Sequence, residues 1–171
     1  MDTYMVILRL IHIIAGVFWV GALLELVGFV LPAARAAGQQ GQPFLQAFIS
    51  RTRFSDVMAG SAALTVVAGV LLYYRVSGHF NSDWVTSTPG VVLSLGAVAG
   101  IAAAVVGVAI MRPTTKRMGT LMVQLSAQQG PPSETQMAEM RRLQIRNEQF
   151  APVVALLSII AVVGMAAARY M

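Results

Sequence analysis

The stretch Leu10–Glu25, LIHIIAGVFWVGALLE, determines the fold class of this chain. It is an apolar run that carries one histidine, one tryptophan and a final carboxylate. Four of its side chains recur at helical spacing and share one helix face: His12, Gly16, Trp19 and Leu23. An ionisable side chain in an apolar span is costly unless it has a partner, so His12 and Glu25 are the first candidates for function.

The whole chain shares this apolar character. Of its 171 residues, 57% are hydrophobic and only 11% are charged, whereas a soluble domain carries about 25% charged residues. Four apolar runs are long enough to cross a bilayer: 4–31, 57–76, 91–111 and 150–168. We therefore expect an all-α polytopic membrane protein, with four transmembrane helices in one bundle and a single domain over 1–171. The lipid bilayer is then the first interaction partner that we expect for this protein.

The connections carry turn and capping signals. Pro32 is expected to end the first span, and Pro43–Arg53 to form a short interfacial helix. Ser55 or Asp56 is expected to cap the second span. Over 112–149 we expect a cytosolic helical hairpin, broken at Gly130, Pro131 and Pro132 and resumed at the capping box Ser133-Glu134-Thr135-Gln136.

The positive charges predict the orientation. The first and third connections hold nine basic residues: Arg35, Arg51, Arg53, Arg112, Lys116, Arg117, Arg141, Arg142 and Arg146. The opposite side holds three: Arg9, Arg75 and Arg169. By the positive-inside rule, we expect a bacterial cytoplasmic membrane protein with both termini outside. The basic residues do not alternate with aromatic ones, which argues against nucleic-acid binding. No basic segment precedes the first span, so a cleavable signal peptide is not expected.

Several chemistries lack the residues that they need. The chain has no cysteine, which excludes disulfides, thiolate ligands and covalent c-type haem attachment. It contains no phosphate-binding glycine loop, no HExxH, no nucleophile elbow and no paired carboxylates at a useful spacing. The sequence therefore does not favour an enzyme. The function classes that remain are redox chemistry, metal transport across the membrane and a structural role in a complex.

Candidate metal ligands gather in the outer half of the predicted bundle. His12 lies about 12 Å along the first span, His79 lies in the outer loop, and Met165 lies near the outer end of the fourth span. Imidazole and thioether groups bind haem iron or copper. A pair of His12 with His79 or Met165 is therefore a candidate haem b site, with Gly16 and Trp19 beside it on the same face. Alternatively, His12 only forms a hydrogen bond to a neighbouring helix.

Two further features have competing interpretations. Glu25 either pairs with Arg35, Arg51 or Arg53 or acts as a proton relay. The third span repeats small residues, and its glycines are expected to allow close helix packing: Gly96, Gly100 and Gly107.

The segment Ile11–Gly21, IHIIAGVFWVG, resembles the first helix of CopD-type copper-resistance membrane proteins and of their relatives, which include the HemJ-type protoporphyrinogen oxidases. These are helical bundles of four or more spans that begin with a His-containing helix and a Trp-x-Gly step. The HemJ branch binds haem b through that histidine, and the resemblance implies this role for His12. The HemJ-type continuation is replaced here by Gly21–Leu26, and the only lysine, Lys116, lies in a connection. Protoporphyrinogen oxidation is therefore not expected.

Three functions follow from these observations. In the first, the protein binds haem b near its outer face and transfers electrons or senses redox state. In the second, it is a cofactor-free accessory subunit of a larger respiratory or photosynthetic membrane complex. In the third, a weaker alternative, the outer residues His12, His79, Met5 and Met171 bind copper for uptake.

Overall fold

The computed structural model describes residues 3–171, except for the side chains of Gln39, Gln42, Gln46 and Ser50. Every regular element in this part of the chain is a helix. Four segments are long and apolar enough to cross a membrane: Thr3–Ala36, Phe54–Val76, Thr88–Ala127 and Glu134–Tyr170. The prediction of an all-α chain with four apolar, span-length helices is therefore confirmed.

The helices follow one another with short connections. In chain order they are α1 (Thr3–Glu25), the π turn η1 (Leu26–Val30), α2 (Leu31–Ala36), the 3₁₀ turn η2 (Gly38–Gln40), α3 (Gly41–Arg51), α4 (Phe54–Val76), α5 (Ser82–Val85), α6 (Thr88–Val106), the π turn η3 (Gly107–Met111), α7 (Arg112–Ala127), α8 (Glu134–Ala167) and the 3₁₀ turn η4 (Ala168–Tyr170).

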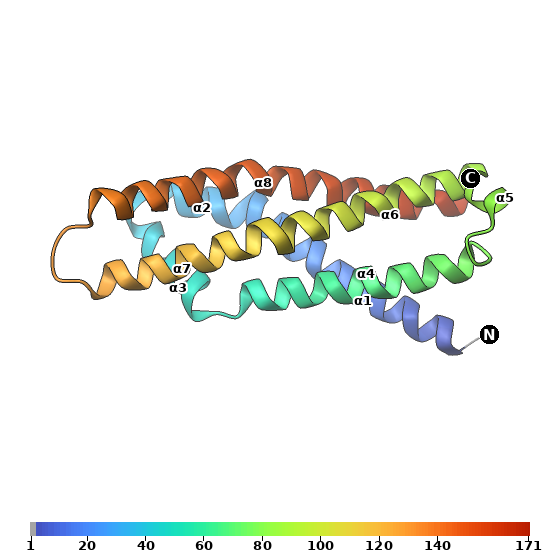
Figure 1. The fold of residues 1–171 in the computed structure, drawn as a ribbon, viewed down its shortest axis with the longest axis horizontal. Helices are drawn as coiled ribbons and strands as arrows, with labels where there is room; N and C mark the ends of the chain where they lie inside the picture. The colour runs from blue at the N-terminus through green and yellow to red at the C-terminus, as the bar shows by residue number, and fades with distance from the viewer. Residues whose placement is uncertain (1–2) are drawn as a thin grey trace.

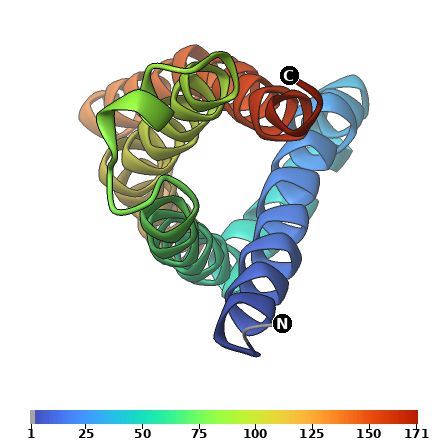
Figure 2. The ribbon, with the colours of Figure 1, turned by 90° about the vertical axis from the view of Figure 1, so that its right-hand side faces the viewer.

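The long helices form two closely packed antiparallel pairs, α1 with α4 and α6 with α8 (Figure 1). Contact between the pairs is sparser, and the end-on view in Figure 2 shows the four helices arranged around a central axis. A small core joins the pairs near their middle: Trp19, Leu23, Ala62, Ala103, Ala104 and Val154. Trp19 is the only large aromatic side chain of this cluster and is 6% exposed.

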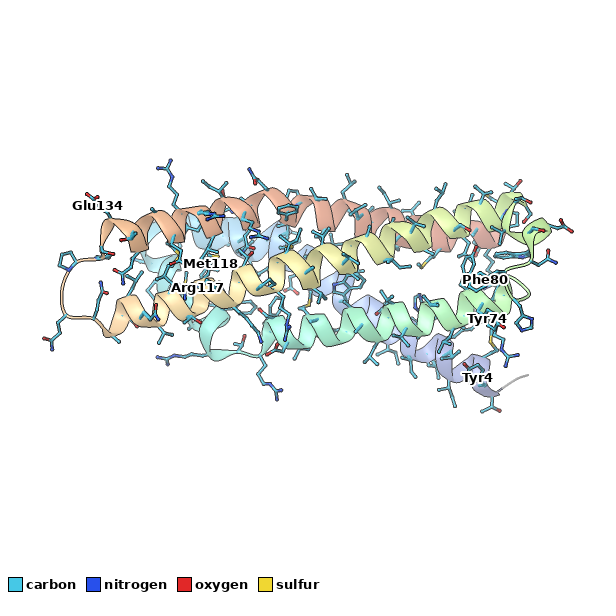
Figure 3. The ribbon with its side chains drawn as sticks, in the orientation of Figure 1. Tyr4, Tyr74, Phe80, Arg117, Met118 and Glu134 are labelled. Carbon is cyan, nitrogen blue, oxygen red and sulfur yellow. The ribbon has the colours of Figure 1, made fainter. Side chains whose placement is uncertain are left out.

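The two ends of the assembly differ in chemistry. One end, here the aromatic end, holds Tyr4, Tyr74 and Phe80, which are labelled in Figure 3. The other end, here the basic end, holds Arg117 and Glu134 (Figure 3). At the aromatic end, the Tyr74 ring contacts the Phe80 ring at 5.4 Å between centroids, and Arg75 lies over the Tyr4 ring at 5.6 Å. At the basic end, Arg117 pairs with Glu139.

The first long helix does not end at Pro32, where the sequence predicts its end. It continues to Ala36 through the π turn η1. Proline lacks an N–H and its ring clashes with the carbonyl four residues earlier. The π turn widens the helix immediately before this proline, and Leu31 N–H bonds to Leu26 O across five residues. The extra residue makes room for the proline ring, so the helix continues.

The third long helix repeats this arrangement. The π turn η3 immediately precedes Arg112-Pro113, and Arg112 N–H bonds to Gly107 O. The helix then continues as α7 to Ala127. The break after it and the capping box of α8 occur where the sequence predicts them. Ser133 Oγ accepts from Gln136 N–H, and the Gln136 side chain accepts from Ser133 N–H.

The start of α4 differs from the expectation. Its N-cap is Arg53, whose side chain makes no cap hydrogen bond, and Thr52 Oγ1 accepts from Phe54 N–H at 3.3 Å, so the prediction of a cap at Ser55 or Asp56 is wrong. Asp56 lies inside the first turn, where its carboxylate accepts from Arg112 and pairs with Lys116, both at 2.7 Å. Two cations satisfy this carboxylate better than the backbone of its own helix does, because hydrogen bonds between charged groups are the stronger ones. The predicted helix over 43–53 is present as α3.

Candidate functional site

His12 lies between α1 and α4. Its Nδ1 is 2.8 Å from the carbonyl oxygen of Thr65. A carbonyl can only accept, so Nδ1 carries the proton and donates, and the lone pair of the neutral ring is on Nε2. The ring is half-buried.

Two glycines make room for this contact. A Cβ built on Gly69 would lie 2.8 Å from His12 Cε1 and 3.0 Å from Nδ1, closer than side chains pack. A Cβ built on Gly16 would lie 3.3 Å from Thr65 Cγ2. Gly16 therefore serves the packing of α1 on α4, and Gly69, which the sequence analysis did not single out, is what admits the histidine ring.

The other two candidate axial ligands lie elsewhere. His79 is exposed in the connection after α4, at a φ of 65°, with its ring 4.6 Å from the Tyr74 ring. Met165 lies on α8 with its Cε directed at α6, 3.8 Å from the position of a Gly100 Cβ. His12 and Met165 thus belong to different helix pairs, and in the described part of the chain neither of them contacts His79. Within 3–171, no group of three His, Cys, Asp or Glu side chains gathers.

The glycines of α6 have different surroundings. A Cβ on Gly96 would lie 3.2 Å from Ala161 O and from Met165 N, and one on Gly164 would lie 3.0 Å from Gly96 Cα. The backbones of α6 and α8 therefore touch at Gly96 and Gly164, whereas Gly107 has no atom within 4 Å of its Cβ position. Gly107 begins the π turn η3 instead of packing against a helix.

Glu25 does not form the expected ion pair in the structure. Among the described residues it has no hydrogen bond or ion pair, and its side chain is exposed. Arg35, one of its predicted partners, instead bonds Glu148 of α8 at 3.0 Å. Glu25 is the last residue of α1 before η1. Its carboxylate remains open to a proton-relay interpretation.

A cavity of about 740 Å³ lies between the two helix pairs, on the basic side of Trp19. Its size falls within the range of about 300–1,000 Å³ that is usual for small-molecule sites. Trp19, Leu23, Ala62 and Val154 line its apolar end, and Arg35 and Arg112 belong to its polar end. Met118, labelled in Figure 3, also lines the polar end. His12 is not among the lining residues.

Helix irregularities surround this cavity. The π turn η1 contributes Leu26 and Val27, and η3 contributes Gly107, Val108 and Met111. The third contributor is Pro152, the proline inside α8. π turns are rare and are frequently found at functional sites. Sequence reasoning missed the cavity, although a glycine-containing segment before X-Pro in two different spans is a signal that marks both turns.

The polar end of the cavity contains an unmatched group. Asn147 Nδ2 donates to Thr115 Oγ1 at 3.3 Å, and Asn147 Oδ1 is buried with no partner in the described chain. Turning the amide over would exchange the two atoms and leave the nitrogen unmatched instead. In either orientation one amide atom of this side chain lacks a protein partner. Burying a polar atom without a hydrogen-bond partner is energetically costly. The unmatched atom therefore indicates a position where a ligand or a water molecule would form the missing hydrogen bond.

No family model, curated protein or solved structure matches this chain.

Proposed function

We propose that this chain is an integral protein of a bacterial cytoplasmic membrane that binds haem b through His12 and transfers electrons or senses redox state. The observation that carries the proposal is the 2.8 Å hydrogen bond from His12 Nδ1 to the Thr65 carbonyl. A metal-binding histidine almost always donates its other ring N–H to a carbonyl, a carboxylate or water, which fixes the tautomer and the ring orientation. His12 meets this requirement and keeps Nε2 for iron.

The placement in the membrane rests on charge and on aromatic residues. The basic end carries the ion pairs of Asp56 with Arg112 and Lys116, which suits the cytoplasmic face under the positive-inside rule. The aromatic end carries the cluster of Tyr73, Tyr74, Phe80 and Trp84. Aromatic rings of this kind favour a membrane–water interface. Both termini would then lie outside, with 112–149 as a cytosolic helical hairpin beneath a four-helix bundle.

The residues present fit haem b at one axial position. His12 would hold the iron. Met165 lies in the other helix pair with its Cε toward α6, and His79 is exposed in a connection, so His12 is the ligand that the geometry supports. When bound, haem b would supply one-electron transfer. Around it, Thr65 would orient His12, and Gly69 would keep the ring seated between the helices.

The first experiment is a visible absorption spectrum of the detergent-purified protein, made in cells supplied with haem, before and after dithionite. A Soret band with sharp α and β bands on reduction is the expected result. His12→Ala should remove these bands while the protein still inserts, and His79→Ala should leave them unchanged. Met165→Leu tests the second ligand: a shift of the bands and of the midpoint potential would identify Met165, and unchanged bands would exclude it. A flat spectrum from the unmodified, well-folded protein contradicts the proposal.

A matched pair of glycine variants tests whether Gly69 positions the His12 ring between α1 and α4. Gly69→Val would push against His12 and should lower haem occupancy several-fold. Gly60→Val is the control, because Gly60 lies on the same helix and has no atom within 4 Å of its Cβ position. An equal loss of haem in both variants would mean that a valine anywhere on α4 lowers haem binding, and that the contact of Gly69 with His12 is not the cause.

An accessory-subunit role is the second candidate, because three glycines of the first two long helices have open space at their Cβ positions: Gly21, Gly28 and Gly60. Small residues on an uncovered helix face allow another helix to approach closely in a membrane. Under this alternative the purified protein has no chromophore and co-purifies with larger membrane subunits. Gly21→Leu should then release those subunits, whereas Gly96→Leu would act only inside the chain.

A further inference from the structure

We infer that the cavity at the basic end binds one monoanionic glycerophospholipid, with an acyl chain toward Trp19 and the phosphate beside Arg35 and Arg112. This inference is independent of the haem proposal, since His12 does not line the cavity. The ligand is amphipathic, carries one negative charge and is long enough to reach from the middle of the bilayer to the cytoplasmic surface.

The length of the cavity matches one leaflet. Trp19 and Arg35 lie at its two ends on one continuous helical segment, sixteen residues apart, which is about 24 Å at 1.5 Å per residue. A bilayer with its headgroup regions is about 40–45 Å thick, so one leaflet is about 20–23 Å. A soluble metabolite would leave the apolar part of such a cavity empty, whereas a lipid fills both parts.

Polarity changes along the cavity in the order that a lipid requires. The Trp19 end contacts the apolar core and is lined by Leu23, Ala62 and Val154. The opposite end is polar and holds seven side chains able to bond a headgroup: Arg35, Ser55, Arg112, Thr115, Gln144, Asn147 and Glu148. Apolar walls with a few placed polar groups are the usual composition of a ligand site.

The charges at the polar end favour a single negative charge. Three charged side chains line it, Arg35, Arg112 and Glu148. Just outside the lining, Asp56 pairs with Arg112 and with Lys116, so these two neighbours add no net charge. The cluster therefore has one excess positive charge. Basic pockets between transmembrane helices on the cytoplasmic side recognise anionic lipid headgroups. A phosphodiester supplies the one negative charge that balances this cluster.

The unmatched amide of Asn147 adds a hydrogen-bonding requirement. Its Oδ1 is buried and has no partner in the described chain, so it can accept from a headgroup hydroxyl. The amide group would otherwise stay desolvated without a partner, which is costly. A phosphatidylglycerol headgroup carries both a phosphodiester for the arginines and a hydroxyl for this oxygen, so phosphatidylglycerol is the probe of choice.

The cavity is bounded by two π turns and by a proline inside a third helix. The turns η1 and η3 and the proline of α8 all supply lining residues. A chance packing gap would not require two π turns and a helix-interior proline, which lacks a backbone N–H, all lining one space. Both π turns also contact α8, so the irregular segments lie together around the site.

Trp19 provides a direct readout. It lines the apolar end and is 6% exposed, so lipids on the outer surface of the protein barely reach it. The second tryptophan, Trp84, lies at the aromatic end in α5 and is removed by Trp84→Phe. In this background, phosphatidylglycerol with brominated acyl chains should quench Trp19 fluorescence at about one lipid per protein. Brominated phosphatidylcholine should quench several-fold less at the same concentration.

Two pairs of variants locate the binding. Gly107→Leu fills the cavity, whereas Gly21→Leu adds the same side chain to a glycine that also has open space but does not line the cavity. Arg112→Gln removes the excess positive charge, whereas Arg141→Gln removes one charge from a residue outside the cavity lining. The first member of each pair should lower phosphatidylglycerol quenching at least five-fold, and the second should leave it unchanged. The arginine pair decides the question if Gly107→Leu fails to fold.

Three outcomes would overturn the inference. Equal quenching by the two brominated lipids would show that the charge of the headgroup does not matter. Equal quenching in Gly107→Leu and Gly21→Leu would place the lipid outside the cavity. Binding of millimolar glycerol 3-phosphate, detected by calorimetry, with unchanged quenching of Trp19 by brominated phosphatidylglycerol would show a soluble phosphate site separate from the acyl-chain site. None of these outcomes bears on a Soret band, so the haem proposal is judged separately.

Discussion

The aromatic half and the basic half of this helix assembly hold their helices together in different ways. In the aromatic half, helices approach closely at glycines: the backbones of α6 and α8 touch at Gly96 and Gly164, and the His12 ring of α1 packs on Gly69 of α4. In the basic half, the helix pairs separate around a cavity and charged side chains reach across between helices. Apolar side chains gain little by leaving lipid, so helices in a membrane depend on such close approach or on polar bonds.

The aromatic half is therefore expected to be rigid, and the basic half is expected to adapt to a ligand. A glycine contact between backbones has no freedom to adjust, because no side chain can change its rotamer there. Ion pairs such as Arg35–Glu148 are more than half exposed at 56% and can rearrange around a ligand. Substitutions in the aromatic half should therefore change stability, and substitutions in the basic half should change binding.

The largest effect is expected for Gly96→Leu. Its Cβ would lie 3.2 Å from Ala161 O and Met165 N, both backbone atoms that cannot move aside without shifting α8. Overpacking of this kind costs about 1–3 kcal/mol or more, and we expect about 3 kcal/mol here. The measurement is the thermal unfolding midpoint in detergent. Gly107→Leu in the open half is the control and should change the midpoint little; a similar loss in both would refute the contrast between the halves.

Gly69→Val should have the next largest effect on stability. The atoms that its Cβ would meet belong to the His12 ring, the end of a side chain that can rotate away. The expected loss is about 1–2 kcal/mol, which covers the overpacking and the lost hydrogen bond to Thr65. The double variant with His12→Ala should recover part of this loss, because the ring is then gone. Absence of any recovery would show that His12 is not the side chain displaced.

Much of the architecture follows from local sequence. The lengths and apolar character of the four runs predict four span-length helices, and Ser133 and Gln136 predict the start of α8 through a capping box that the structure contains. These features depend on residues only a few positions apart. Composition and short-range spacing are enough to define them.

The sequence does not predict features that depend on contacts between residues far apart in the chain. Pro32 ends a regular helix by local rules, yet a π turn before it lets the helix continue. Asp56 has the position of a capping residue but bonds Arg112, which is 56 residues away in sequence. The cavity itself is formed where η1, η3 and Pro152 come together, and no single segment of sequence contains all three.

Asp56→Asn should have a smaller effect that depends on salt. The variant leaves Arg112 and Lys116 without their shared carboxylate. These side chains are 40% and 48% exposed, so water and ions screen their interaction with Asp56. We expect a slightly lower unfolding midpoint at low salt and no difference from the unmodified protein at about 1 M salt. A loss that persists at high salt would indicate a role for Asp56 other than this ion pair.

Asn147→Leu is the finest test of the contrast, because its two expected effects have opposite signs. In the delipidated protein it removes a buried amide oxygen that has no partner, and it also removes the hydrogen bonds from Asn147 Nδ2 to Thr115 Oγ1 and Met118 Sδ. The first change stabilises and the second destabilises by similar amounts of about 1 kcal/mol, so the midpoint should hardly move. Phosphatidylglycerol should then stabilise the variant less than the unmodified protein, because the headgroup hydroxyl has lost its acceptor. An equal lipid-induced shift in both proteins would remove Asn147 from the proposed site, whereas a large loss of stability without lipid would place it among the structural contacts of the rigid half.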